Sequence, residues 1–144
     1  MRKIVLAASA IGFILVINAC KKSASNNSSA KTVQNLSGSY SLVSLTASLL
    51  GASVDLYDSL PACDKDNVIQ LNANMSAQFV DAGVPCVPPS DSTGTWSLSS
   101  NTDSIYVDGS PNFIKSWDGK TLVLTSQEEI SGFPVTATTT LSKK

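Results

Sequence analysis

Residues 38–46 read Gly-Ser-Tyr-Ser-Leu-Val-Ser-Leu-Thr, a run in which apolar and small polar side chains alternate. Side chains of a β-strand point to opposite faces in turn, so this alternation predicts a strand with one buried face. The chain repeats the pattern in short runs separated by turn residues, of which Asp118-Gly119 is the strongest hairpin signal. The predicted strands span residues 38–46, 67–72, 76–81, 94–99, 104–107, 112–117, 120–126 and 133–141.

These eight runs predict an all-β fold, because no long stretch shows helical periodicity. Their spacing is typical of a β-barrel or a β-sandwich. Eight strands in up-and-down order can close completely, which removes exposed sheet edges. The predicted interior residues are Tyr40, Leu42, Ile69, Leu71, Phe79, Trp96, Leu98, Ile105, Val107, Leu122, Leu124, Val135 and Leu141.

Two of the predicted strands begin alike. Residues 38–42 and 94–98 both follow the pattern Gly-[Ser/Thr]-aromatic-Ser-Leu. The glycine permits a tight turn before the strand, and the aromatic and leucine side chains share one face. We therefore expect Tyr40 and Trp96 to fill one end of the barrel interior, although a Ser-rich chain can also produce such an echo by coincidence.

Several segments together resemble the small lipocalin-like domains of Gram-negative, Bacteroidota-type lipoproteins. They are residues 38–42, 61–68, 71–74 and 94–98, together with Cys86. The resemblance covers residues 37–141 and implies an eight-stranded antiparallel up-and-down lipocalin-like β-barrel, but very little about chemistry. Three departures stand out: Tyr40 replaces the usual Trp, Met75 replaces the usual turn Gly, and the Arg that packs on this Trp in larger lipocalins has no clear counterpart.

The N-terminus predicts export and lipid attachment. Arg2 and Lys3 precede an apolar run over residues 4–17, which is shorter than the roughly 20 residues of a membrane-spanning helix and fits a signal peptide. Residues 17–20, Ile-Asn-Ala-Cys, resemble a bacterial lipobox, in which Cys20 receives acyl chains such as palmitate. The alternative is an ordinary signal peptide cut nearby, with Cys20 as a bystander.

We therefore expect a lipoprotein signal peptide over residues 1–19, a lipidated Cys20 with a flexible polar tether over residues 20–36, and a barrel domain over residues 37–144. The tether is rich in Ser, Asn and Lys and has few bulky apolar groups to offset the entropy of ordering. Lys21, in a position where Asp often marks inner-membrane retention, points to the outer membrane. The face of that membrane stays open.

The remaining two cysteines, Cys63 and Cys86, are expected to form a disulfide in an oxidising envelope compartment. The alternatives are a metal site and a reactive thiol. Two cysteines without histidine fall short of a zinc ligand set. Closing this loop is worth roughly 3 kcal/mol in the chain-entropy account.

Composition weighs against several classes of function. The chain has no His, which removes imidazole bases, His metal ligands and Ser-His triads. Its net charge is −1, and scattered lysines do not make the basic patch that nucleic acids require. No phosphate-binding glycine loop or nucleophile elbow is present. We expect no enzymatic activity, no cofactor, no metal and no nucleic-acid partner.

The long apolar connection over residues 49–61 suggests where a ligand would enter. Long ordered loops are often lids or binding surfaces, although this one could simply plug the barrel end. The predicted ligand-binding residues are Tyr40, Leu56, Tyr57, Phe79 and Trp96. Two functions stay open: a binding module for a small apolar or amphipathic molecule, and a structural or interaction protein with a filled barrel and an envelope partner.

Overall fold

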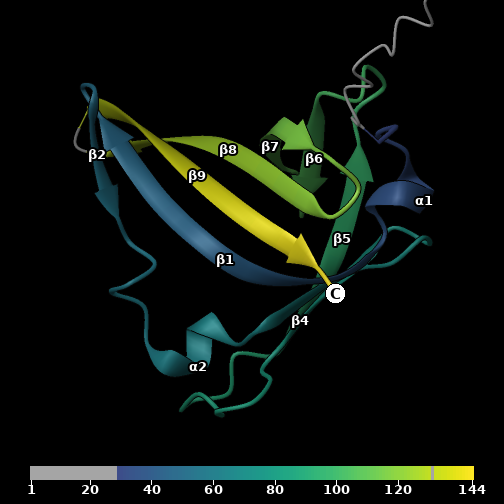
Figure 1. The fold of residues 1–144 in the computed structure, drawn as a ribbon, viewed down its shortest axis with the longest axis horizontal. Coiled ribbons are helices and arrows are strands. Elements are labelled where there is room, and N and C mark those ends of the chain that lie inside the picture. The colour runs from purple at the N-terminus through teal and green to yellow at the C-terminus, as the bar shows by residue number, and fades with distance from the viewer. Residues whose placement is uncertain (1–28, 131) are drawn as a thin grey trace, which may run out of the picture.

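A computed structural model describes residues 29–130 and 132–144, so the predictions for the signal peptide, Cys20 and most of the tether lie outside the described residues. Within these ranges the chain forms nine strands and two four-residue helices (Figure 1). None of the helices in the described ranges has the length and apolar character needed to cross a membrane. The elements are α1 (Val33–Leu36), β1 (Gly38–Leu49), β2 (Ala52–Asp55), α2 (Ala62–Lys65), β3 (Val68–Leu71), β4 (Ser76–Val80), β5 (Ser92–Leu98), β6 (Ser104–Val107), β7 (Ser110–Trp117), β8 (Thr121–Ile130) and β9 (Phe133–Lys143).

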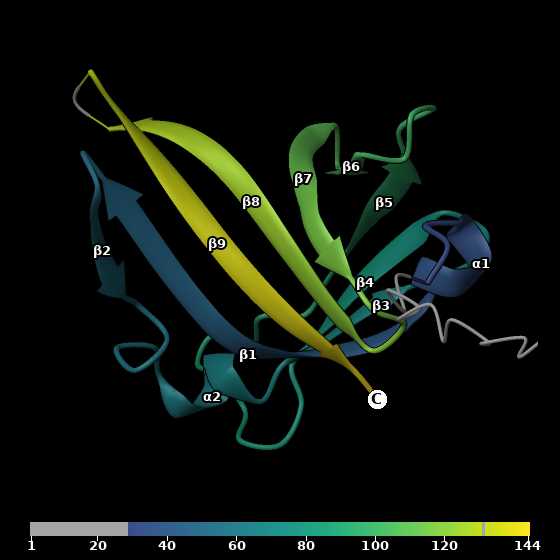
Figure 2. The ribbon, with the colours of Figure 1, turned by 45° about the horizontal axis from the view of Figure 1, so that its top comes forward.

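The sheet closes on itself as a barrel. Each strand from β3 to β9 pairs antiparallel with the next, and β1 pairs with β3 on one edge. On its other edge β1 pairs with β9 along nine residue pairs, and the two strands run side by side in Figures 1 and 2. The predicted all-β, eight-stranded antiparallel up-and-down barrel is therefore confirmed, with β1 and β3–β9 as its strands.

The ninth strand, β2, lies in the connection over residues 49–61, where the sequence pattern predicts no strand. It pairs with the C-terminal end of β1, from Leu49↔Ala52 to Thr46↔Asp55. This is the same edge of β1 that pairs with β3 near the N-terminal end of the strand. Because β1 has twelve residues and β3 only four, β3 leaves most of that edge open. β2 gives hydrogen-bond partners to the backbone N–H and C=O groups of β1 on that edge.

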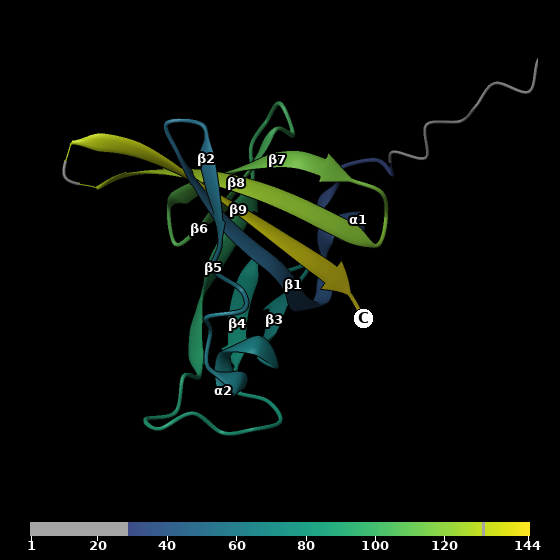
Figure 3. The ribbon, with the colours of Figure 1, turned by 60° about the vertical axis from the view of Figure 1, so that its left-hand side comes forward.

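β8 and β9 also extend past the barrel. Ten residue pairs join them, ending at Ile130↔Phe133, whereas β7 pairs with β8 only from Trp117 to Phe113. Beyond that point their free halves continue, beside the end of β1 and β2, as a four-stranded projection (Figures 2 and 3). We call this projection the wing; it consists of β2 and residues 46–49, 126–130 and 133–138.

The barrel has one closed end, which α1 covers. Thr32 caps this helix by accepting a hydrogen bond from the backbone N–H of Asn35 at 3.2 Å, and Leu36 is fully buried. The Tyr40 hydroxyl donates to the Leu36 carbonyl at 2.7 Å. The folded domain thus begins before residue 37, since the last four residues of the expected tether form an ordered helix.

A lysine lies over the aromatic residues at the closed end. The Lys143 ammonium is 6.0 Å from the centre of the Tyr40 ring and 5.7 Å from that of Trp117, distances at which a cation is attracted to a ring face. It also donates to the Asn35 carbonyl at 2.8 Å, which ties β9 to α1. Lys143 thus packs on the first-strand aromatic residue, for which the sequence pattern gives no clear arginine partner.

The turn between β3 and β4 keeps a left-handed residue although Met75 replaces the usual glycine. Its φ angle is 67°. Asn72 and Ser76 hold the turn through a backbone hydrogen bond of 2.9 Å, and the Asn74 side chain accepts from the Ser76 N–H. These contacts hold Met75 in a conformation that costs a non-glycine residue of the order of 1 kcal/mol.

The core matches most of the predicted interior. Tyr40, Trp96, Ile105, Leu122 and Leu141 are buried in one cluster. That cluster also contains four residues that the sequence pattern does not predict: Leu36, Ala77, Ile114 and Trp117.

The predicted Cys63–Cys86 disulfide is confirmed. It joins α2 to the loop between β4 and β5, with the two Cα atoms 5.2 Å apart. The Asp81 carboxylate orders this loop by accepting from the N–H groups of Cys86 and Ser90. Asp64 lies beside both cysteines, but the two sulfur atoms are bonded to each other and do not form a metal ligand set.

Removing the disulfide should cost about 3 kcal/mol of unfolding free energy, because the open loop gains entropy in the unfolded chain. The test is urea unfolding of the Cys63→Ala/Cys86→Ala double variant against the parent. Unfolding of the reduced parent serves as the control and should match the variant. Equal stability of parent and variant would contradict the expected contribution.

Stability should fall at alkaline pH through Tyr40. Burial raises the pKa of Tyr40 from 10.0 to about 12, so between these values the folded state holds a proton that the unfolded chain releases. The stabilisation is present below pH 10 and is lost as pH rises through about 12, by roughly 2 to 3 kcal/mol. Urea unfolding at several pH values should show this loss in the parent and in Tyr106→Phe, a partly exposed control, but not in Tyr40→Phe. Parallel pH profiles for the parent and Tyr40→Phe would refute the assignment.

Candidate functional site

The barrel interior contains a cavity of about 300 Å³. It lies among the inward faces of β3, β4 and β6–β9, next to the filled closed end. Its walls consist of Ile69, Leu71, Phe79, Ile105, Val107, Ser110, Asn112, Leu124, Thr139 and Leu141.

The walls are chemically simple. Seven of the ten side chains are hydrophobic and three are neutral and polar. The Asn112 amide is already engaged on one side, since it donates to the Ser110 carbonyl at 3.2 Å. No ionisable side chain lines the cavity, so its walls suit an apolar group and offer few polar contacts.

Side-chain size explains why the closed end is full and the next layer is not. Tyr40, Trp96 and Trp117 occupy the closed end, and the Trp96 indole N–H donates to the Asn72 carbonyl at 2.8 Å. The cavity wall instead contains shorter side chains, among them Ser110 and Thr139. These short polar side chains fill less of the interior than the aromatic rings do.

Of the five predicted ligand-binding residues, Phe79 lines the cavity. Tyr40 and Trp96 are 0% and 2% exposed and belong to the core of the closed end. Leu56 and Tyr57 follow β2, where both N–H groups donate to the Leu45 carbonyl at 2.9 and 3.1 Å. Contact of these five residues with a ligand stays a prediction.

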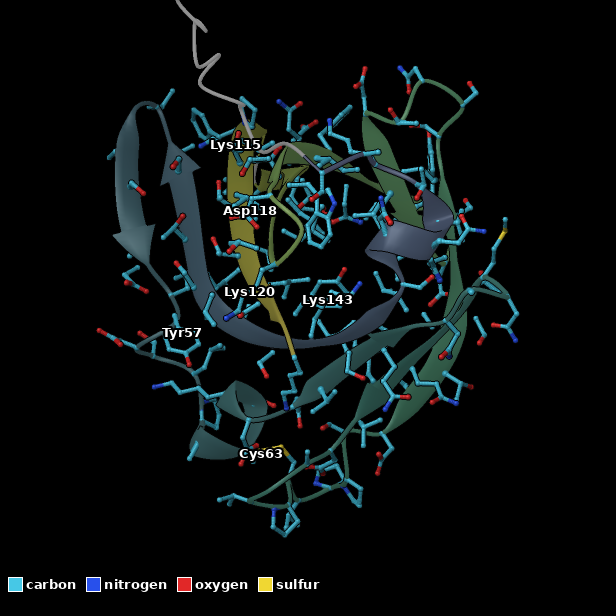
Figure 4. The ribbon with its side chains drawn as sticks, turned by 45° about the vertical axis from the view of Figure 1, so that its right-hand side comes forward. Tyr57, Cys63, Lys115, Asp118, Lys120 and Lys143 are labelled. Atoms are coloured by element: carbon cyan, nitrogen blue, oxygen red, sulfur yellow. A yellow bond between two sulfur atoms is a disulfide. The ribbon has the colours of Figure 1, made fainter. Side chains whose placement is uncertain are left out.

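The apolar connection does not reach the cavity. None of residues 49–61 is among the cavity walls. Much of the connection is β2, which pairs along β1, while Leu50 at the preceding turn is 81% exposed. Tyr57 packs under the Lys65 ammonium, 5.3 Å from its ring centre, and Figure 4 shows it apart from Lys143 at the closed end.

Sequence reasoning missed two of the three polar residues of the cavity wall, Ser110 and Asn112, whereas the alternation along residues 133–141 places the third, Thr139, on the face of Leu141. Thr139 lies two residues before the predicted interior residue Leu141 on β9, and Asn112 lies two residues before the buried Ile114 on β7. The period of two therefore places both on the inward face, but polar side chains give no hydrophobic signal. Ser110 begins β7 beside the turn and is exposed.

Comparisons with known proteins give one match. A family model for the lipocalin-like domain matches residues 36–126, which include both disulfide cysteines and most of the cavity wall. Among proteins of curated function and among solved structures, nothing matches the chain significantly. A lipocalin-like barrel is compatible with small-ligand binding and suggests a binding module.

Proposed function

The chain belongs to the lipocalin-like domain family, and we propose from this premise that it is a non-enzymatic binding module for a small apolar or amphipathic molecule. The cavity carries the proposal. Its volume of about 300 Å³ lies at the lower end of the usual range for ligand pockets, roughly 300–1,000 Å³. Its wall combines seven hydrophobic side chains with a few polar groups that could orient a ligand.

The rival function is a structural or interaction protein whose filled barrel binds an envelope partner through its surface. This rival function requires the whole barrel to be packed as fully as the closed end is around Trp96 and Trp117. The cavity next to that cluster favours ligand binding instead.

We further propose that the domain is attached to the outer membrane through acyl chains on Cys20. The hydrophobic run, the small residue at 19 and the cysteine support this proposal. The position of α1 is compatible with it, because a tether ending at the closed end leaves the other end of the barrel free.

A cavity-filling substitution tests ligand binding. Thr139→Phe places a large ring among the cavity walls and should lower the affinity for N-phenyl-1-naphthylamine, an apolar fluorescent probe, by about tenfold or more. Thr138→Phe is the matched control, since Thr138 is the adjacent residue on the opposite face of β9. Fluorescence titration measures both, with circular dichroism to verify folding.

Absence of probe binding by the parent, together with lipid extracts that contain no co-purified molecule, would support the filled-barrel function. Equal affinity of the parent and a folded Thr139→Phe variant would place the probe outside this cavity and contradict the proposal.

Metabolic labelling tests the anchor. Cells supplied with an alkynyl palmitate analogue should label the parent chain, and the protein should sediment with outer membranes. Cys20→Ala should abolish both the label and the sedimentation, whereas Cys63→Ala should retain the label. Labelling of Cys20→Ala at the level of the parent would show that the lipid is attached elsewhere.

A further inference from the structure

We propose that the ligand of this barrel is an amphiphile with a cationic, amine-type head group, whose apolar part occupies the cavity while its head lies beside Glu128. The inference rests on the proposed binding function and specifies the class of ligand. It comes from a second hollow that adjoins the cavity and carries the only charged side chain on the walls of either space.

The second hollow forms where β7 and β8 separate. Their last pair toward the wing is Phe113↔Thr125, after which β8 continues to Ile130 paired with β9 alone. The strands beyond this point border a crevice of about 350 Å³. Its walls are Ser110, Pro111, Asn112, Phe113, Ser126, Gln127 and Glu128.

The cavity and the crevice adjoin each other. Ser110 and Asn112 line both spaces, so the cavity and the crevice are neighbours, and the proposal places one ligand across these two residues. The cavity wall is mainly hydrophobic, whereas the crevice is bordered by hydroxyl, amide and carboxylate groups together with Pro111 and Phe113. This division matches a molecule with one apolar and one polar end.

Glu128 stands on the inward face of the wing. Side chains alternate along β8, and Leu122 and Leu124 on this face are buried in the barrel. The pairing of β8 with β9 continues without a register shift, so Ser126 and Glu128 share the face of these leucines. Glu129 points to the opposite face.

The groups around Glu128 suit a cation. Its carboxylate accepts hydrogen bonds and donates none, and an ammonium carries three donors. The Asn112, Ser126 and Gln127 oxygens provide further acceptors on the same walls. A carboxylate head would meet repulsion from Glu128, with no lysine on either wall to offset it.

Charge over the whole barrel favours the same ligand. Eight of the eleven acidic residues lie on the wing or on α2 and the loops beside it, whereas Asp103, Asp108 and Asp118 belong to other turns. Of the six lysines in the described residues, Lys65 belongs to α2 and Lys115 to β7, and the other four lie around the closed end, where the Lys143 backbone N–H donates to the Lys120 carbonyl (Figure 4). Such a field attracts cations toward the mouth. The four are Lys31, Lys120, Lys143 and Lys144.

Three amphiphiles with the same tail test the proposal: decylamine, decanol and decanoic acid, each below its micelle concentration at pH 7. Competition against N-phenyl-1-naphthylamine gives their affinities for the parent. We expect decylamine to bind about three- to fivefold tighter than decanol, the size of effect that a partly exposed ion pair provides, and decanoic acid to bind weakest.

Two variants then locate the head group. Glu128→Gln should bring decylamine within about twofold of decanol, and Glu129→Gln, with the same loss of charge on the neighbouring outward residue, should keep the preference of the parent. Equal binding of the three amphiphiles, a preference for decanoic acid, or an amine preference that survives Glu128→Gln would overturn the inference while leaving the proposed function intact. Failure of the parent to bind the probe would overturn both.

Discussion

The pairing of the first barrel strand with the last is the constraint on which the other features depend. Nine residue pairs between β1 and β9 turn an open sheet into a barrel and give the molecule an inside. The chain outside the apolar N-terminal run is only about 38% hydrophobic, so side-chain burial alone provides a thin core. The backbone hydrogen bonds that close the barrel need no apolar side chains, so strands rich in Ser and Thr can form these bonds as well as apolar strands do.

Closure also divides the interior into two parts. At one end α1, Tyr40 and Trp117 fill the barrel. Lys143 in the last strand donates a hydrogen bond to α1 and so holds that end in place. Further along, shorter side chains such as Ser110 and Thr139 line the cavity. The filled part gives stability to a barrel whose other part holds the cavity.

The alternation of side chains predicted the strands well, because it is a direct consequence of pleating. It could not predict both Ile114 and Trp117 as core residues, since they are three positions apart and a bulge near Lys115 is needed to bring both inward. β2 also escaped prediction. Its four residues are all exposed, so no buried face leaves a pattern in its sequence.

The candidate site was less predictable than the fold. Phe79 was found because it is both large and in register, whereas Ser110 and Asn112 are polar and were not. The crevice beside Glu128 depends on the different lengths of β7 and β8, which only the paired strands reveal. Lys143 escaped notice for a related reason, because its contact with Tyr40 joins opposite ends of the domain sequence.

That separation determines when the barrel can form during synthesis. Leu42 must pair with Leu141, so closure has to wait until β9 is available to pair with β1. Until then β1 has an open edge that other chains can pair with. Contacts between residues so far apart in the sequence also slow folding, because the chain loses conformational entropy in bringing them together before the core contacts form. Until closure, β1 therefore stays open to association with other chains for as long as this slow, long-range pairing takes.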